Sequence, residues 1–140
     1  MAITQDDVVY TAVATAENGR DGRVSTDDGK LDVVVNPPKE QGGSGAGTNP
    51  EQLFAAGYSA CFQGALAVVA RQEGIDIAGS TVTAKVGIGK NDDGFGLIVE
   101  ISATIPNADA ATATSLVEKA HQVCPYSKAT RGNITVTLSV

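Results

Sequence analysis

The segment that decides the fold reads GTNPEQLFAAGYSACFQGALAVVA, residues 47–70, and it carries no charge after its first turn. Asn49 suits an N-cap, Pro50 suits the first helical position, and Gly74 suits a C-terminal stop. The sequence therefore predicts one helix over residues 50–73. Apolar residues lie nearly all round this helix, and such a helix must be covered on every side. One small sheet cannot provide that cover.

Segments with the two-residue alternation of strands flank the predicted helix on both sides. The predicted strands cover residues 8–16, 22–26, 31–35, 81–90, 95–105 and 134–140. A second helix is predicted over residues 109–123, because Pro125 should end it after Cys124. The element order is βββ-α-ββ-α-β with strands in antiparallel groups, so we expect an α+β fold. The sequence shows neither an internal repeat nor a linker, and we expect a single domain over residues 1–140.

Length, composition and charge indicate which class of protein this chain belongs to. A chain of 140 residues with 42% hydrophobic and 19% charged residues is typical of one globular domain. The net charge is −6 and no Lys/Arg cluster is present, so nucleic-acid binding is not expected. The N-terminus lacks a basic segment followed by an apolar one, which predicts a cytoplasmic protein without a secretory signal. The longest uncharged run, about 17 residues, is short for a membrane span and contains polar residues.

The sequence has two cysteines, Cys61 and Cys124. In a reducing cytosol a permanent disulfide is disfavoured, so they are either inert thiols or a cycling redox pair. Burial in an apolar helix would raise the pKa of the Cys61 thiol, whereas only the thiolate is nucleophilic. Its own segment offers no cation before Arg71, so a reactive Cys61 needs a cation from elsewhere. Cys61 as a small buried hydrophobe remains the alternative.

Three other features of the sequence each allow a functional and a purely structural interpretation. His121 could act as a base for the Cys124 thiol or be a polar residue near a helix end, and a zinc site built from it and the cysteines is disfavoured. Arg20 stands in a turn, where charges are usually solvated. The glycine-rich residues 40–48 lack the Lys-Ser/Thr of a phosphate-binding loop, which favours a flexible connection.

Two long motifs, TNPEQLFAAGYSACF and VCPYSKATRGN, resemble the signature segments of the organic hydroperoxide resistance (Ohr) family within the OsmC-like superfamily. The segments YTA…GRDG and GIG…GFGL are similar as well, so the resemblance covers essentially the whole chain. It implies the OsmC-like fold. It also implies a thiol peroxidase that reduces organic hydroperoxides to alcohols and uses neither a metal nor a flavin cofactor.

The resemblance also implies roles for particular residues. Cys61 would be the peroxidatic nucleophile and Cys124 the resolving thiol, so that a Cys61–Cys124 disulfide forms in each cycle. Arg20 and Glu51 would form the salt-bridged pair that activates the thiolate and orients the peroxide. The reductant implied is a dithiol, a lipoyl group carried on a metabolic enzyme complex.

Helix geometry adds a constraint on this site. Glu51 and Cys61 lie ten residues apart on the predicted helix, a rise of about 15 Å, and point to different faces. If Glu51 and Arg20 serve Cys61, they must reach it from another subunit. We therefore expect an intertwined homodimer with two composite sites, as in the family.

Aromatic residues near the cysteines predict an apolar approach to the thiol and a preference for bulky or fatty-acid hydroperoxides over hydrogen peroxide. The predicted substrate-binding residues are Phe54, Tyr58, Phe62 and Tyr126. The alternatives are a member of the broader OsmC-like branch with other peroxide preferences, a non-catalytic cysteine redox sensor or small apolar ligand-binding protein, and a structural dimer with inert cysteines.

Overall fold

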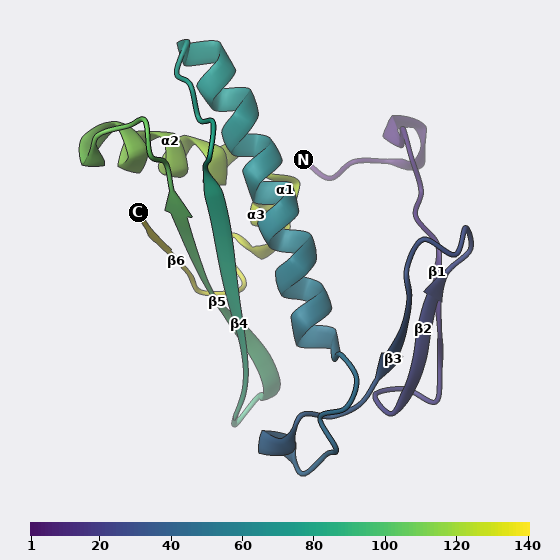
Figure 1. The fold of residues 1–140 in the computed structure, drawn as a ribbon. Helices are drawn as coiled ribbons and strands as arrows, with labels where there is room; N and C mark the ends of the chain where they lie inside the picture. Colours follow the sequence, from purple (N-terminus) through teal and green to yellow (C-terminus); the bar gives the residue numbers. More distant parts are fainter. The chain divides into compact units, whose positions relative to one another are not determined.

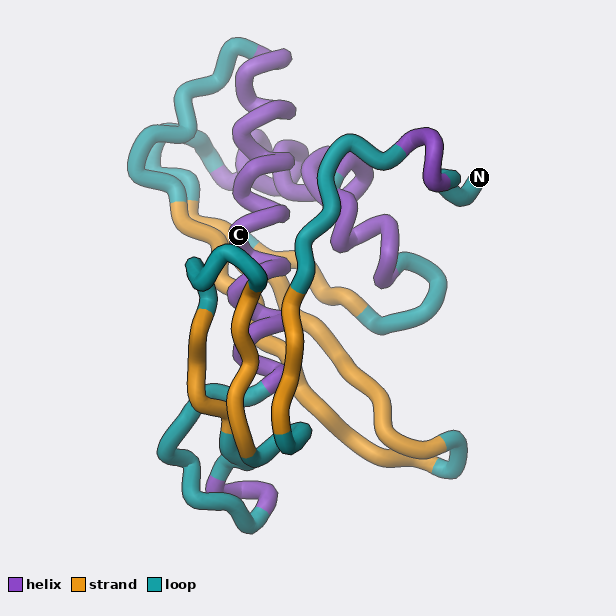
Figure 2. The backbone as a smooth tube through the Cα atoms, turned by 90° about the vertical axis from the view of Figure 1, so that its right-hand side faces the viewer, coloured by secondary structure: helices purple, strands orange, loops and turns teal.

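The computed structural model describes all residues, Met1–Val140. The chain divides into two compact units, Met1–Pro50 and Glu51–Val140. Figure 1 labels the elements of both units, and Figure 2 shows that each contains its own sheet. We expected one domain over residues 1–140. That the two units together form this single domain stays a prediction.

The N-terminal unit is built on one antiparallel sheet of three strands in the order β1-β2-β3. Its elements are η1 (Gln5–Asp7), β1 (Ala14–Glu17), β2 (Gly22–Thr26), β3 (Asp32–Val35) and η2 (Lys39–Gln41). The first strand was predicted from residue 8, but it begins at Ala14 because its partner β2 ends opposite it, at Thr26. Val35 is the one buried apolar side chain of this unit, whereas Val9 and Tyr10 are exposed. The unit therefore has almost no core of its own.

The C-terminal unit combines three helices with a second three-stranded sheet in the order β4-β5-β6. Its elements are α1 (Pro50–Glu73), β4 (Thr81–Asn91), β5 (Gly94–Thr104), α2 (Ala110–Val123), α3 (Pro125–Thr130) and β6 (Val136–Ser139). The α+β class and the predicted bounds of the long helix are confirmed. Gly74 adopts the left-handed conformation expected of a helix stop, with φ of 68°. Asp109 caps α2 by accepting a hydrogen bond of 2.7 Å from the Thr112 N–H.

Two details of this unit differ from the prediction. Strand β6 pairs with β5 in parallel, not antiparallel, because the connection through α2 and α3 returns the chain to the end of the sheet where β5 began. Helix α3 was not predicted. Pro125 ends α2 as expected, but it also occupies the first position of the next helix, where its missing N–H costs nothing.

The core lies on one face of the second sheet, where the helices cover it (Figure 1). Along β5, Val99, Ile101 and Ala103 are buried, whereas Ile98 on the opposite face is 54% exposed. On α1, the side chains that share this core include Tyr58, Phe62, Leu66, Val69 and Ala70.

The remaining side of α1 is apolar but uncovered. Exposed residues recur every fourth position, at Ala56, Ala60, Gly64 and Val68. By length and composition alone the helix could cross a membrane, although the core helices of soluble proteins pass the same test. An apolar helix with one open side requires further cover.

We expect Ile101→Ala to lower the free energy of unfolding by about 2–5 kcal/mol, because it leaves a cavity in the core. The matched control is Ile98→Ala on the same strand, where the removed atoms face outward and the loss should be clearly smaller. Urea unfolding of the two variants measures the difference. Equal losses would contradict the assignment of the buried face.

Candidate functional site

The two cysteines meet where α1 packs against the junction of α2 and α3. Cys61 lies in the middle of α1, and Cys124 is both the C-cap of α2 and the N-cap of α3. The Cys61 and Cys124 sulfurs lie 3.6 Å apart, within hydrogen-bonding range for sulfur, and both thiols are free. Cys124 is fully buried, and Cys61 is half-buried. Because a disulfide needs an S–S distance of about 2.05 Å, a modest approach of the sulfurs would join them.

The surroundings of Cys61 within this unit oppose ionisation. Burial raises the pKa of the Cys61 thiol, and the neighbouring Cys124 raises it further because two close sulfurs do not readily share negative charge. The Tyr126 backbone N–H acts in the opposite direction and lowers the pKa. The net shift is upward, so a thiolate here requires an additional positive charge.

The Tyr126 amide is a site group that sequence reasoning missed. It is placed by the first turn of α3, which follows directly from Cys124 and Pro125. The available signal was Pro125, because proline is common at the first position of a helix, where free backbone N–H groups lie close by.

Three aromatic rings pack together where α1 meets α3. Phe54, Tyr58 and Tyr126 form a cluster with centroid separations of 5.7–6.2 Å in edge or tilted contacts. Gly57 makes room for it, because a Cβ at this position would lie 2.8 Å from the Tyr126 hydroxyl oxygen. A glycine inside a helix is costly, and here it lets the Tyr126 ring lie directly on α1.

The four predicted substrate residues differ in accessibility. Tyr58 and Phe62 are fully buried in the core, whereas Phe54 is partly buried and Tyr126 is 40% exposed. Of the four, only Phe54 and Tyr126 therefore have surface that solvent reaches. Substrate binding by these side chains stays a prediction.

A chain of polar groups lies behind the aromatic cluster. The Tyr58 hydroxyl oxygen lies 2.9 Å from Ser127 Oγ and 3.0 Å from Thr130 Oγ1. His121 Nδ1 lies 2.7 Å from Ser127 Oγ. The pKa of His121 is lowered, first by burial and then by the positive charge of Arg131. The ring is therefore neutral near pH 7 and bonds to Ser127.

Arg20 and Glu51 belong to different units. Arg20 lies in the loop between β1 and β2, which is held by two hydrogen bonds of 2.7 Å, from Asn18 Nδ2 to the Asp21 carbonyl and from Asn36 Nδ2 to Asp21 Oδ1. Glu51 lies in the first turn of α1. The approach of Arg20 and Glu51 to a Cys61 thiol stays a prediction.

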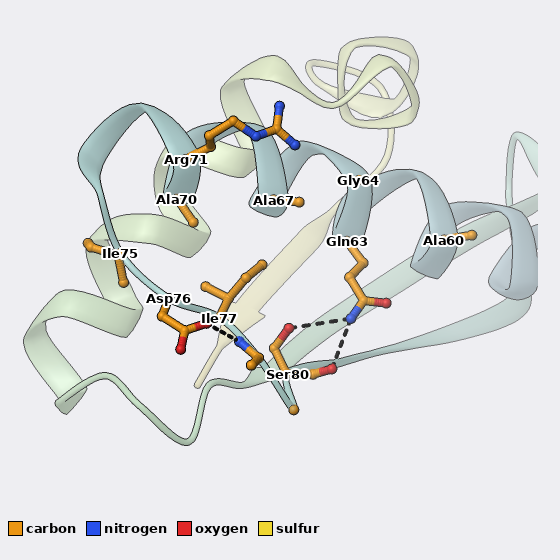
Figure 3. Close-up of a pocket in the computed structure, with 12 residues that line it drawn as sticks. Ala60, Gln63, Gly64, Ala67, Ala70, Arg71, Ile75, Asp76, Ile77 and Ser80 are labelled. Atoms are coloured by element: carbon orange, nitrogen blue, oxygen red, sulfur yellow. Dashed lines mark hydrogen bonds between the residues drawn. The ribbon is translucent and has the colours of Figure 1, made fainter.

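An open groove of about 750 Å³ lies elsewhere along α1 (Figure 3). It is lined by Ala60, Gln63, Gly64, Ala67, Ala70, Arg71, Ile75, Asp76, Ile77, Ala78, Gly79 and Ser80. Gln63 Nε2 donates to the Ser80 carbonyl over 2.9 Å and ties α1 to the segment before β4. Neither cysteine lines this groove. No group of three or more His, Cys, Asp or Glu side chains is placed to hold a metal ion.

Comparison with known proteins gives a consistent result. The family described as OsmC-like protein matches residues 42–139. The organic hydroperoxide resistance protein of Xanthomonas axonopodis pv. citri is 53% identical, with 95% of each chain covered. OhrB of Bacillus subtilis is 45% identical over 94% of this chain and 98% of its own. The crystal structure of an organic hydroperoxide resistance protein from Elizabethkingia anophelis is 54% identical, with a TM-score of 0.90 over 96% of this chain and 97% of that one.

The lowered pKa of His121 predicts a stability that depends on pH. In the unfolded chain the histidine has its ordinary pKa of about 6.5, so it binds a proton more tightly than in the folded chain. The free energy of unfolding should therefore fall as the pH drops below about 6.5. The slope should not exceed about 1.4 kcal/mol per pH unit for one proton. Urea unfolding between pH 7.5 and 5.5 isolates this residue, because it is the sole histidine. His121→Gln should flatten the profile, and a parent profile that is already flat would contradict the assignment.

Proposed function

This chain belongs to the OsmC-like family, and on that premise we propose that it is a thiol peroxidase that reduces organic hydroperoxides to alcohols. The observation that carries the proposal is the pair of free thiols 3.6 Å apart, one half-buried and one buried. Relatives named organic hydroperoxide resistance proteins supply the substrate class.

The proposed cycle uses both cysteines. The Cys61 thiolate attacks the distal oxygen of the hydroperoxide, the O–O bond breaks, and the alkoxide takes a proton and leaves as the alcohol. Cys61 is then a sulfenic acid, and attack by the Cys124 sulfur forms the disulfide and releases water. An external dithiol reduces that disulfide by exchange and becomes oxidised itself. We propose a dihydrolipoyl group on a partner protein as this dithiol, and the cycle requires no bound cofactor.

Arg20 and Glu51 are proposed to generate the thiolate. Burial raises the pKa of Cys61, so a nearby guanidinium must offset the desolvation of the anion. A carboxylate such as that of Glu51 can hold a guanidinium in a planar two-point pair and aim it at the sulfur. The same guanidinium can orient the peroxide oxygens for attack.

A homodimer is proposed on two grounds. The N-terminal unit leaves apolar side chains such as Val9 and Val34 exposed, and α1 leaves its small-residue side open. Glu51 also lies about 15 Å from Cys61 along the axis of α1, farther than the two side chains can span. A second copy of the chain would cover these apolar surfaces and bring its own Glu51 and Arg20 to the thiol.

The proposed substrates are bulky or fatty-acid hydroperoxides. Phe54 and Tyr126 offer aromatic surface beside the half-buried Cys61, and apolar contact favours an alkyl or aryl chain over hydrogen peroxide. The fully buried Tyr58 and Phe62 are proposed to shape the path to the Cys61 thiol from the core side. The protein is proposed to act in the cytoplasm, where dithiol reductants keep such a pair cycling.

Variants at the two cysteines test the catalytic cycle. With one equivalent of cumene hydroperoxide, the reduced parent should consume the peroxide and lose the mass of two hydrogen atoms. Cys61→Ser should consume none. Cys124→Ser should consume it once and then stall or over-oxidise, because no second thiol closes the disulfide. Peroxide assays and intact-protein mass spectrometry give the result.

The same experiment separates the alternatives. A redox sensor would form the disulfide but would not turn over with dihydrolipoamide as reductant, and a structural dimer would leave the peroxide untouched. Hydrogen peroxide serves as the comparison substrate, and turnover equal to that of cumene hydroperoxide would refute the proposed preference. Peroxide consumption by Cys61→Ser at the parent rate would refute the nucleophile.

Mixed dimers test whether Glu51 acts across the subunit interface. A dimer of one Cys61→Ser chain and one Glu51→Ala chain, isolated with two affinity tags, keeps one intact composite site if Glu51 serves the partner's thiol. It should then show about half the parent activity, while each variant alone is strongly impaired. Activity no higher than that of Glu51→Ala alone would show that Glu51 acts within its own chain. A fully active monomer in light scattering would refute the dimer.

A further inference from the structure

One polar cluster takes no part in the proposed cycle. We call it the buried hydroxyl network, and it consists of Tyr58, His121, Ser127 and Thr130. Tyr58 and Ser127 expose no surface, and Thr130 exposes 2%. Burying hydroxyl groups costs free energy unless each finds a partner, and no buried side-chain polar atom here lacks one. Polar groups maintained in a core at such a cost favour one fixed geometry, because hydrogen bonds are directional and apolar contacts can slide.

The network joins the two segments that carry the sulfurs. Tyr58 lies one helical turn before Cys61, on the same side of α1. Ser127 lies in α3, three residues after Cys124, whose sulfur lies 3.6 Å from that of Cys61. The 2.9 Å contact between the Tyr58 hydroxyl and Ser127 Oγ therefore ties these two turns together directly.

The number of hydrogen atoms that the hydroxyl groups can donate determines which group is the donor in each hydrogen bond of the network. Four contacts of 2.7–3.1 Å run from His121 Nδ1 through the hydroxyls of Ser127, Tyr58 and Thr130 to the Ser127 carbonyl. The carbonyl only accepts, so Thr130 donates to it, Tyr58 donates to Thr130, and Ser127 donates to Tyr58. Three hydroxyl hydrogens are then used, and the fourth bond requires a hydrogen on His121 Nδ1.

Ser127 is thus held through its hydroxyl and its backbone carbonyl. Its hydroxyl accepts from His121 and donates to Tyr58, and its carbonyl accepts from Thr130. The Tyr126 ring, seated against Gly57, adds an apolar contact beside it. These contacts fix α3 on α1 at the point where the sulfurs meet.

We propose that Ser127, oriented by Tyr58 and His121, is a positioning residue for the thiol pair. It keeps the Cys124 sulfur within reach of the Cys61 sulfur. The consequence for turnover rests on the proposed function. Once Cys61 is a sulfenic acid, attack by Cys124 forms the disulfide and water, whereas a second hydroperoxide transfers another oxygen and gives the sulfinic acid and an alcohol. Correct placement of Cys124 favours the first outcome.

Ser127→Ala removes the central hydroxyl and tests the proposal in two ways. In a glutathione redox buffer, the equilibrium between dithiol and disulfide reports how well the two sulfurs are placed, without any peroxide. We expect it to shift about tenfold toward the dithiol, because misplacement lowers the effective concentration of one thiol for the other. With excess cumene hydroperoxide, mass spectrometry should find over-oxidised Cys61 at about tenfold lower peroxide than in the parent.

Control variants separate positioning from general stability. Ser127→Thr keeps the hydroxyl and should retain most of the parent behaviour, while Tyr58→Phe should reproduce the Ser127→Ala shifts. Asp109→Ala removes the cap of α2, costs about 1 kcal/mol, and touches none of the network, so it should leave both readouts unchanged. A folded Ser127→Ala or Tyr58→Phe with the parent's redox equilibrium, or an equal shift in Asp109→Ala, would overturn the proposal.

The tautomer of His121 is an independent readout. Nitrogen NMR of the parent at pH 7.5 should find the hydrogen on Nδ1 and none on Nε2, and the opposite tautomer would overturn the hydrogen count on which Ser127 depends. If the parent closes its disulfide in glutathione but consumes no hydroperoxide, the proposed function fails while the positioning role stands. If the parent is an active peroxidase and Ser127→Ala matches it in both readouts, the positioning role alone fails.

Discussion

The burial of an ionisable sulfur on an apolar helix is the constraint on which the rest of this structure depends. Cys61 sits on α1 among core residues, where burial raises the pKa of its thiol. The C-terminal unit offsets this only in part, through the Tyr126 N–H at the start of α3. A reactive thiolate therefore needs a charge that the surroundings of Cys61 in its own unit do not supply, and Arg20 in the N-terminal unit is the proposed source. The apolar site that hinders ionisation is also what would favour an alkyl hydroperoxide over hydrogen peroxide.

The same helix is one of the grounds on which we propose a partner subunit. The core covers one side of α1, while small residues from Ala56 to Val68 remain exposed on another, and the N-terminal sheet buries only Val35. Small side chains let backbones approach closely, so the open side of α1 suits contact with another regular element better than contact with water. Under the proposed function, dimerisation and activation of the thiol would be two aspects of one problem, because the partner would supply both cover for α1 and charge for Cys61.

Much of this arrangement was predictable from local sequence signals, and the failures have physical causes. The bounds of α1 followed from Pro50, Gly74 and the uncharged run between them. The parallel pairing of β6 did not follow, because alternation predicts a strand but not its direction. Helix α3 was missed because a proline is typical both of the position after a helix ends and of the first position of a helix, and Pro125 fits both. The Tyr126 amide and the hydroxyl network could not be predicted, since both depend on which backbone and side-chain atoms meet in three dimensions.

The different burial of the two sulfurs has a consequence for the reductive half of the proposed cycle. Cys124 is fully buried and held by the turn that Ser127 fixes, whereas Cys61 remains half-buried beside Tyr126. A disulfide between them would need only a modest approach from 3.6 Å, so the oxidised pair would keep this difference in access. An incoming dithiol thiolate would then reach the Cys61 sulfur, form the mixed disulfide there and release Cys124 as the leaving thiol. In the proposed cycle the Cys124 sulfur would thus stay protected from both peroxide and reductant, and the chemistry with outside molecules would be confined to Cys61.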